Sequence, residues 1–181
     1  MANEALVSAV KVIVGNARAG KLDEAYAGYK ALFSTLSILG FVLIVWGFAR
    51  APIIRVWSPP DWTRYVAMVM MVPVFILLIA AYVPGDIKAR VKHPFLVAIK
   101  TWALAHLVAN GDLASIILFG SFLAYAVFDR IALKRRPASG HVTVVETGMP
   151  RDIIAVVGGL ILYVVFLVWL HPLLIGTSPL P

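Results

Sequence analysis

Six polar side chains lie inside long apolar stretches of this sequence, where a polar group is costly unless it finds a partner. They are Lys100, His106, Asn110, Tyr125, Tyr163 and His171. Two of the six are histidines, and a neutral imidazole ring is a good ligand for a metal ion or for haem iron. His106 and Asn110 are four residues apart, so they share one face of a helix. Any chemistry is therefore expected around His106.

Each of these residues also has a purely structural interpretation. His106 could form a hydrogen bond to a neighbouring helix, because polar side chains commonly join membrane helices in this way. His171 precedes Pro172 and could be a solvated helix end. Lys100 could extend to the membrane surface or pair with an anionic group such as a propionate. Of the remaining histidines, His93 is expected only to cap a helix, and His141 lies in a polar loop.

Other signs of catalysis are few. The sequence contains no nucleophile elbow, phosphate-binding loop, dinucleotide fingerprint or zinc motif. It also contains no cysteine, which excludes disulfides, Cys nucleophiles, thiolate-ligated haem and Cys-ligated iron–sulfur clusters. The sequence thus leaves open whether the chain is an enzyme.

The composition predicts an integral membrane protein. Hydrophobic residues make up 61% of the 181 residues and charged residues 14%, against roughly half and a quarter in soluble proteins. A soluble fold of this size could not bury so much apolar surface. The formal net charge is +7, but the basic residues flank apolar stretches. We therefore interpret them as anchors at the surface of a lipid bilayer, and we expect no nucleic-acid partner.

Five stretches are apolar enough to be predicted membrane spans, each close to the roughly 20 residues that a spanning helix needs. They are residues 32–49, 65–83, 94–109, 113–128 and 153–170. Residues 1–31 are amphipathic, and their apolar run is too short to span, so an interfacial segment is expected. The predicted organisation is an all-α membrane helical bundle, with this N-terminal segment, a transmembrane domain at 32–176 and a tail at 177–181.

Two connections between the predicted helices are informative. Asn110, Gly111 and Asp112 alone join the third and fourth stretches. Gly111 suits the end of one helix and Asp112 the N-cap of the next, so these helices should form a tight antiparallel hairpin. Residues 134–152 form one long polar loop, in which 143–145 could be a short extended piece and are more plausibly irregular.

The basic residues also predict the orientation. Twelve Lys and Arg residues lie in the N-terminal segment and in the two connections on its side of the membrane, against three on the opposite side. Because basic residues favour the cytoplasmic side, we expect a cytoplasmic N-terminus and a periplasmic C-terminus in the inner (plasma) membrane. The third and fifth helices then run outward, so His106 and His171 can lie at similar depth. If His106 binds a metal ion or haem iron, His171 is the best candidate for a second ligand.

Several segments carry a family resemblance. They are residues 84–94 (PGDIKARVKHP), 102–106 (WALAH), 110–112 (NGD), 119–122 (FGSF) and 129–130 (DR), with support from 41–46 (FVLIVW) and 169–171 (WLH). Over roughly residues 20–176 the chain resembles the NnrU family of membrane proteins, which is named for genes found near those for nitrite and nitric oxide reduction. The family also looks related to the plant 15-cis-zeta-carotene isomerase, a membrane protein that uses haem b.

This resemblance implies a haem b site, with His106 as the first candidate ligand. The expected cofactor-binding residues are His106, His171, Lys100 and Asn110, of which His106 and His171 would bind the metal. Three functions follow. The favoured one is a supporting factor, in assembly or regulation, for nitrite and nitric oxide reduction, with other membrane proteins of denitrification as partners. The alternatives are a haem b-dependent isomerase of a carotenoid or isoprenoid and a structural subunit of a larger membrane complex.

The predicted orientation can be tested with reporter fusions. A reporter joined after Pro181 should behave as periplasmic, and one inserted in the 137–148 loop should behave as cytoplasmic, because an odd number of spans separates the termini. Reversed signals from both fusions would contradict the orientation. A cytoplasmic signal from both would show that the last stretch does not cross the membrane.

Overall fold

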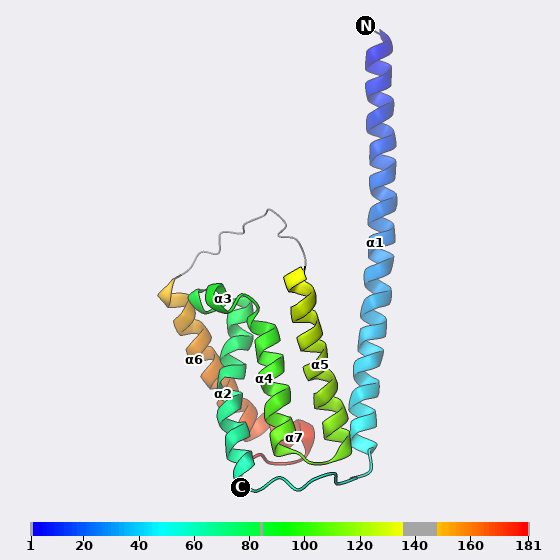
Figure 1. The fold of residues 1–181 in the computed structure, drawn as a ribbon. Coiled ribbons are helices and arrows are strands. Elements are labelled where there is room, and N and C mark those ends of the chain that lie inside the picture. Colours follow the sequence, from blue (N-terminus) through cyan, green and yellow to red (C-terminus); the bar gives the residue numbers. More distant parts are fainter. Residues whose placement is uncertain (1, 84, 136–147, 181) are drawn as a thin grey trace. The chain divides into compact units, whose positions relative to one another are not determined.

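The computed structural model describes residues 2–83, 85–135 and 148–180, and for residues 2–25 the backbone alone. The described chain is helical, with no strand among these residues, which confirms the predicted all-α membrane bundle. It divides into two compact units, Met1–Ala51 and Pro52–Pro181, and each is described by itself (Figure 1).

The first unit is one helix, α1 (Ala2–Arg50), of 49 residues. At 1.5 Å per residue it is roughly 74 Å long, more than twice the roughly 30 Å of membrane hydrocarbon. Its part Tyr26–Arg50 is long and apolar enough to span. The helix is continuous across the predicted boundary at residue 32, and Lys30 Nζ lies 4.4 Å from the centre of the Tyr26 ring. The interfacial role of residues 1–31 stays a prediction.

The second unit contains four main helices, α2 (Trp62–Tyr82), α4 (Pro94–Ala109), α5 (Leu113–Arg135) and α6 (Met149–Val165), and a short α3 (Asp86–Val91). α6 packs on α2, α2 on α4, and α4 on α5, so the main helices form a row in which neighbours along the chain alternate in direction (Figure 1). α2, α5 and the helical segment Met149–Ile175 can each span a membrane. α4 has 16 residues and is shorter, at roughly 24 Å.

The connection between α4 and α5 confirms the predicted hairpin. Asp112 Oδ1 accepts a hydrogen bond of 2.9 Å from the Ser115 N–H, which is the expected N-cap. Burial acts to raise the pKa of Asp112, but hydrogen bonds from Ser115 and from nearby backbone N–H groups outweigh it and hold the pKa below its usual value. The turn therefore carries a charged cap at neutral pH.

The extended segment before α2 holds this turn from outside. The Gly111 carbonyl accepts hydrogen bonds from the N–H groups of Val56 (2.8 Å) and Trp57 (3.1 Å), and the Leu113 N–H donates to the Ile54 carbonyl (2.9 Å). A Cβ at position 111 would collide with the Trp57 carbonyl, so only glycine fits here. The hairpin end that follows His106 is thus fixed in place.

Two of the predicted helix ends were wrong. α5 continues past Phe128, through Asp129 and Arg130, to Arg135, because charged residues mark the edge of the apolar stretch and not the end of the helix. The last helix does not end at Leu170. It continues as a π-helical turn, Phe166–Leu170, and as α7 (His171–Ile175). Residues 136–147, which include the expected piece at 143–145, lie outside the described residues.

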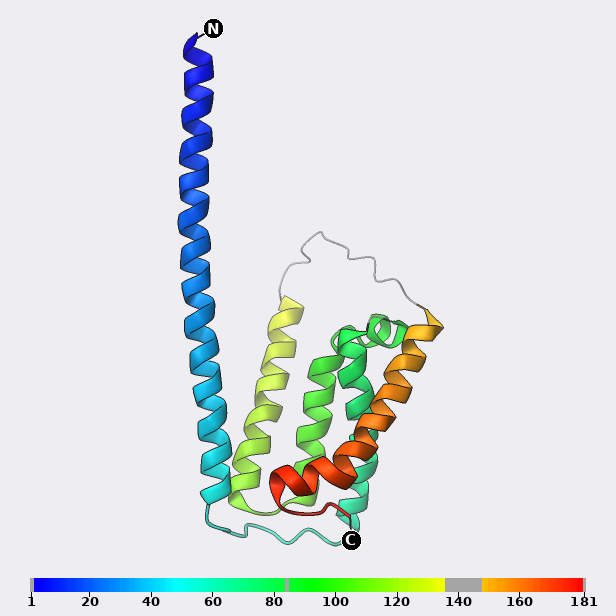
Figure 2. The ribbon, with the colours of Figure 1, turned by 180° about the vertical axis from the view of Figure 1, so that it is seen from behind.

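The π-helical turn has a local cause in Pro172. Proline has no N–H to donate, and its ring clashes with the carbonyl four residues earlier in an α-helix. Here the preceding residue, His171, donates its backbone N–H to the Phe166 carbonyl, five residues back, and the widened turn accommodates the proline. The chain ends α7 at Gly176, in the left-handed conformation (φ 81°) typical of a helix C-terminus. Figure 2 shows this segment turning across the end of the second unit.

The closest approach between α2 and α6 is at Gly159. Gly159, Ala155 and Ala80 are buried, and such small residues allow membrane helices to approach closely. A Cβ on Gly159 would lie 2.6 Å from Ile76 Cα and 2.7 Å from its nitrogen, so the backbone of α2 itself occupies the space. A Cβ on the neighbouring Gly158 would meet only Ile79 side-chain carbons, at 3.9 and 4.0 Å.

Substitution of these two glycines should therefore have opposite effects. Gly159→Ala should destabilise the protein by about 1–3 kcal/mol, the usual cost of overpacking, because α2 must move. Gly158→Ala should be neutral or slightly stabilising, since alanine favours a helix over glycine by up to about 1 kcal/mol. Unfolding of both variants in mild detergent measures the difference. Equal stability of the two would show that α2 and α6 are not in this close contact.

Candidate functional site

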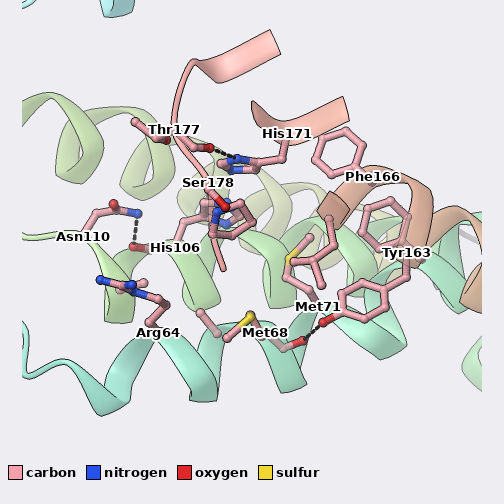
Figure 3. A pocket seen from close by; sticks show the side chains of 15 residues that line it. Arg64, Met68, Met71, His106, Asn110, Tyr163, Phe166, His171, Thr177 and Ser178 are labelled. Atoms are coloured by element: carbon pink, nitrogen blue, oxygen red, sulfur yellow. Dashed lines mark hydrogen bonds between the residues drawn. The ribbon is translucent and has the colours of Figure 1, made fainter. Parts of the chain in front are cut away.

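A cavity of about 270 Å³ lies in the second unit, at the end where α4 finishes. Its walls come from α2, from the end of α4, from the segment 163–171 that joins α6 to α7, and from the C-terminal residues 177–179 (Figure 3). The hairpin turn and the widened π-helical turn both border this end of the bundle. These two turns therefore help to position the residues that line the cavity.

One face of α2 forms the first wall. Arg64, Met68, Met71 and Phe75 line the cavity, and their spacing of four, three and four residues places them on one side of the helix. Arg64 stands in the first turn, and Phe75 is eleven residues, roughly 16 Å, further along. This wall is therefore charged at one end and apolar along the rest of its length.

His106 is the main polar group that α4 contributes. Its Nδ1 lies 2.8 Å from the Trp102 carbonyl oxygen, one turn earlier. A carbonyl can only accept, so this contact assigns the ring hydrogen to Nδ1 and leaves Nε2 with a free lone pair. The ring stacks on Phe119 of α5 at 4.5 Å between centroids and lies 5.3 Å from the Trp102 ring. The direction of the imidazole is thus fixed by a hydrogen bond and two aromatic neighbours.

His171 reaches the same cavity from the other side in the same state. Its Nδ1 lies 2.8 Å from the Thr177 carbonyl oxygen, which again assigns the hydrogen to Nδ1 and frees Nε2 (Figure 3). The Phe166 ring stands edge-on to it at 6.0 Å. Both histidines line the cavity. Their similar depth, predicted from the alternation of spans, corresponds to one shared site.

The other polar groups of the cavity differ in part from those expected. The Asn110 amide donates to the His106 carbonyl at 2.9 Å and lines the cavity as well. Lys100 does not line it, since six residues turn a helix by roughly 240° from His106. Arg64 was not expected as a site residue, and Tyr163, whose hydroxyl donates to the Met68 carbonyl at 3.1 Å, was noted only as a polar residue within a span. The predicted topology places the start of α2 and the end of α4 on the same side of the membrane. This placement could have indicated Arg64 as a site residue.

The donor set suits a macrocyclic ligand better than a bare metal ion. Zinc sites use three or four protein ligands, and the described residues contain no group of three or more His, Cys, Asp and Glu side chains that could hold a metal ion. Haem iron takes four nitrogens from its porphyrin and needs one or two axial ligands from the protein. Two imidazoles with free Nε2 atoms meet that requirement.

The size of the cavity sets a second condition. Small-molecule pockets span roughly 300–1,000 Å³, and this cavity is slightly smaller. A porphyrin is larger than this cavity. It would bind there only if its edge extended beyond the walls or if residues 177–179 were displaced. Those residues belong to the tail after α7, and the His171–Thr177 contact is the side-chain hydrogen bond that joins them to the helix.

Comparison with known families agrees with the sequence motifs. The family model described as NnrU protein matches residues 8–179, nearly the whole chain. The chain belongs to the NnrU family. No curated protein and no solved structure matches it closely enough to show a relationship. Within this NnrU chain, the segments WALAH and NGD carry His106 and Asn110 to the cavity.

The longest motif of the NnrU chain lies away from the cavity. Residues 85–94 form α3 and the start of α4, at the other end of the second unit (Figure 1). Asp152 Oδ1 accepts a hydrogen bond from the Ile87 N–H at 3.1 Å, and Lys88 Nζ donates to the Ala81 carbonyl at 2.7 Å. These contacts tie α3 to α6 and α2. This motif therefore has a structural role at the end of the bundle away from His106.

Proposed function

We propose that this NnrU-family protein binds haem b in the cavity, with His106 as the principal axial ligand and His171 as the second. The observation that supports this most is the common state of the two imidazoles. Each uses Nδ1 on a backbone carbonyl, leaves Nε2 without a protein partner among the described residues and lines the cavity. A histidine that ligates a metal usually donates its other ring N–H in this way, which fixes its tautomer and orientation.

The two histidines are held with unequal firmness. His106 lies within α4, and its ring is packed against Trp102 and Phe119. His171 follows a π-helical turn, and its ring bonds to the tail at Thr177. When bound, haem would supply an iron centre for redox chemistry or for binding of a small molecule. His106 would hold this group more firmly than His171 would.

We propose that the protein uses this site as a supporting factor, in assembly or regulation, for nitrite and nitric oxide reduction in the inner membrane. The name of the family points to this setting. The described lining of the cavity contains histidines and one arginine but no carboxylate, lysine or cysteine, so it offers few groups for acid–base or nucleophilic catalysis. The N-terminus would be cytoplasmic and the C-terminus periplasmic, as the basic residues predict.

One observation favours a second candidate, a haem b-dependent isomerase of a carotenoid or isoprenoid. Met68, Met71, Phe75 and Leu167 give the cavity an apolar wall that could hold part of a polyene. In this function His106 and His171 keep the same roles as ligands, and the apolar wall positions the substrate.

Haem binding is tested on the purified protein in mild detergent. Wild type should carry haem with a Soret absorption band. His106→Ala should lose most of the haem, and His171→Ala should retain haem with a changed spectrum, because its ring is the more weakly held ligand. His93→Ala, at the other end of the unit, is the matched control and should resemble wild type. Undiminished haem in monodisperse His106→Ala would remove the ligand assignment, and well-folded wild type without haem would overturn the proposal.

A deletion strain separates the two candidate functions. For a supporting factor, deletion should lower nitrite or nitric oxide reduction and leave the carotenoid isomers unchanged. Complementation with wild type should restore reduction, and complementation with His106→Ala should not. Altered carotenoid isomers with normal nitrite and nitric oxide reduction would instead favour the isomerase.

A further inference from the structure

We propose that Arg64 binds an anionic carboxylate on the ligand of this cavity and so imposes one orientation on it. The inference rests on the proposed haem function and names the part of the ligand that the protein would recognise. For haem, the carboxylates are the two propionates on one edge of the porphyrin.

The charge of Arg64 has no acidic partner among the described residues. Arg64 is the charged side chain among the residues that line the cavity, setting the histidines aside. Asp61 lies one turn earlier, yet the two are joined only by a backbone hydrogen bond of 3.3 Å from the Arg64 N–H to the Asp61 carbonyl. No ion pair to Arg64 occurs within the part of the chain that the structure describes. A guanidinium at such a position is suited to a carboxylate, which it can bind through two parallel hydrogen bonds.

The cavity has a polar end and an apolar end (Figure 3). Asn110, Thr177 and Ser178 border the cavity together with Arg64. Ser178 Oγ accepts a hydrogen bond from the Leu180 N–H at 3.2 Å, so its own hydrogen remains free to donate. Met71, Phe75 and Phe166 line the rest, and the Phe75 and Phe166 rings are 5.4 Å apart. A ligand that matches both ends has an anionic edge and an apolar body.

Of the cations on α2 and α4, Arg64 is the one placed to bind the carboxylate. Lys100, the other cation that could meet a propionate, does not line the cavity. Arg64 stands at the start of α2, and His106 lies within one turn of the end of α4, which runs antiparallel to α2. Because Arg64 and His106 line the same cavity, a ligand held by His106 can present its anionic edge to Arg64. Arg64 is thus a positioning residue for the ligand and not an axial ligand.

The experiment compares haem with its dimethyl ester, in which both propionates are neutral. Full-length protein is produced without haem, and each porphyrin is titrated in a neutral detergent free of phospholipid. Arg64→Ala should weaken haem binding about tenfold, in line with a charge-assisted hydrogen bond, and should change ester binding less than twofold. Wild type should bind the ester about as weakly as Arg64→Ala binds haem. Arg64→Lys should fall between wild type and Arg64→Ala, because lysine keeps the charge without the planar fork.

Arg55→Ala is the matched control, since it removes the same charge at the same end of the unit from a side chain that does not line the cavity. It should bind both porphyrins like wild type. Equal weakening of haem and ester by Arg64→Ala would assign Arg64 a general packing role and overturn the inference. If Arg64→Ala changed the binding of neither porphyrin, the inference would also be overturned. Arg64 would then be assigned to an anion outside the cavity, such as a lipid phosphate. Failure of wild type to bind either porphyrin would instead overturn the proposed haem function.

Discussion

Hydrocarbon offers no hydrogen-bond partner, and this constraint explains how polar side chains are accommodated within the described membrane helices. Within the described residues, no buried polar side-chain atom lacks a partner. The partner is repeatedly a backbone carbonyl of a helix, whose second lone pair is available: Thr35 donates to Ala31, Ser121 to Ile117 and Tyr163 to Met68. His106 follows the same rule through Nδ1, whereas His171 uses Nδ1 on the Thr177 carbonyl of the tail. In both residues the free Nε2 is a consequence of Nδ1 donating to a backbone carbonyl.

The main helices of the second unit were predictable because each is an apolar stretch bounded by residues that favour turns or helix ends, whereas α3 and α7 were not predicted. Gly111 and Asp112 are an example, since their turn was predicted from residue type and the structure reproduces its N-cap. The errors arose at residues that are compatible with more than one local structure. Asp129 and Arg130 mark the membrane edge but are good helix residues, so α5 continues. Pro172 normally stops a helix, yet the π-helical turn removes its clash, and periodicity gives no sign of such widening.

The site was predictable only to the level of depth. Alternating spans place His106 and His171 on one side of the membrane, and that needed no knowledge of packing. Which residues face each other depends on how each helix is rotated about its axis, and this is decided by contacts between segments far apart in the chain. Tyr163 bonds to Met68, 95 positions away, and Arg64 of α2 lines the same cavity as His106 of α4. Lys100 was chosen for its polarity alone, and its position on α4 turns it away.

The near contact of Gly159 with Ile76 also bears on how fast a ligand could exchange. The backbones of α2 and α6 touch there, four residues before Tyr163, so these two walls cannot separate without breaking the core of the unit. The tail is different, because the His171–Thr177 hydrogen bond is the side-chain contact that holds it to α7. Opening of this short segment is a local event that leaves the helix packing intact. A ligand in this cavity would therefore enter and leave by a local opening, without global unfolding of the bundle.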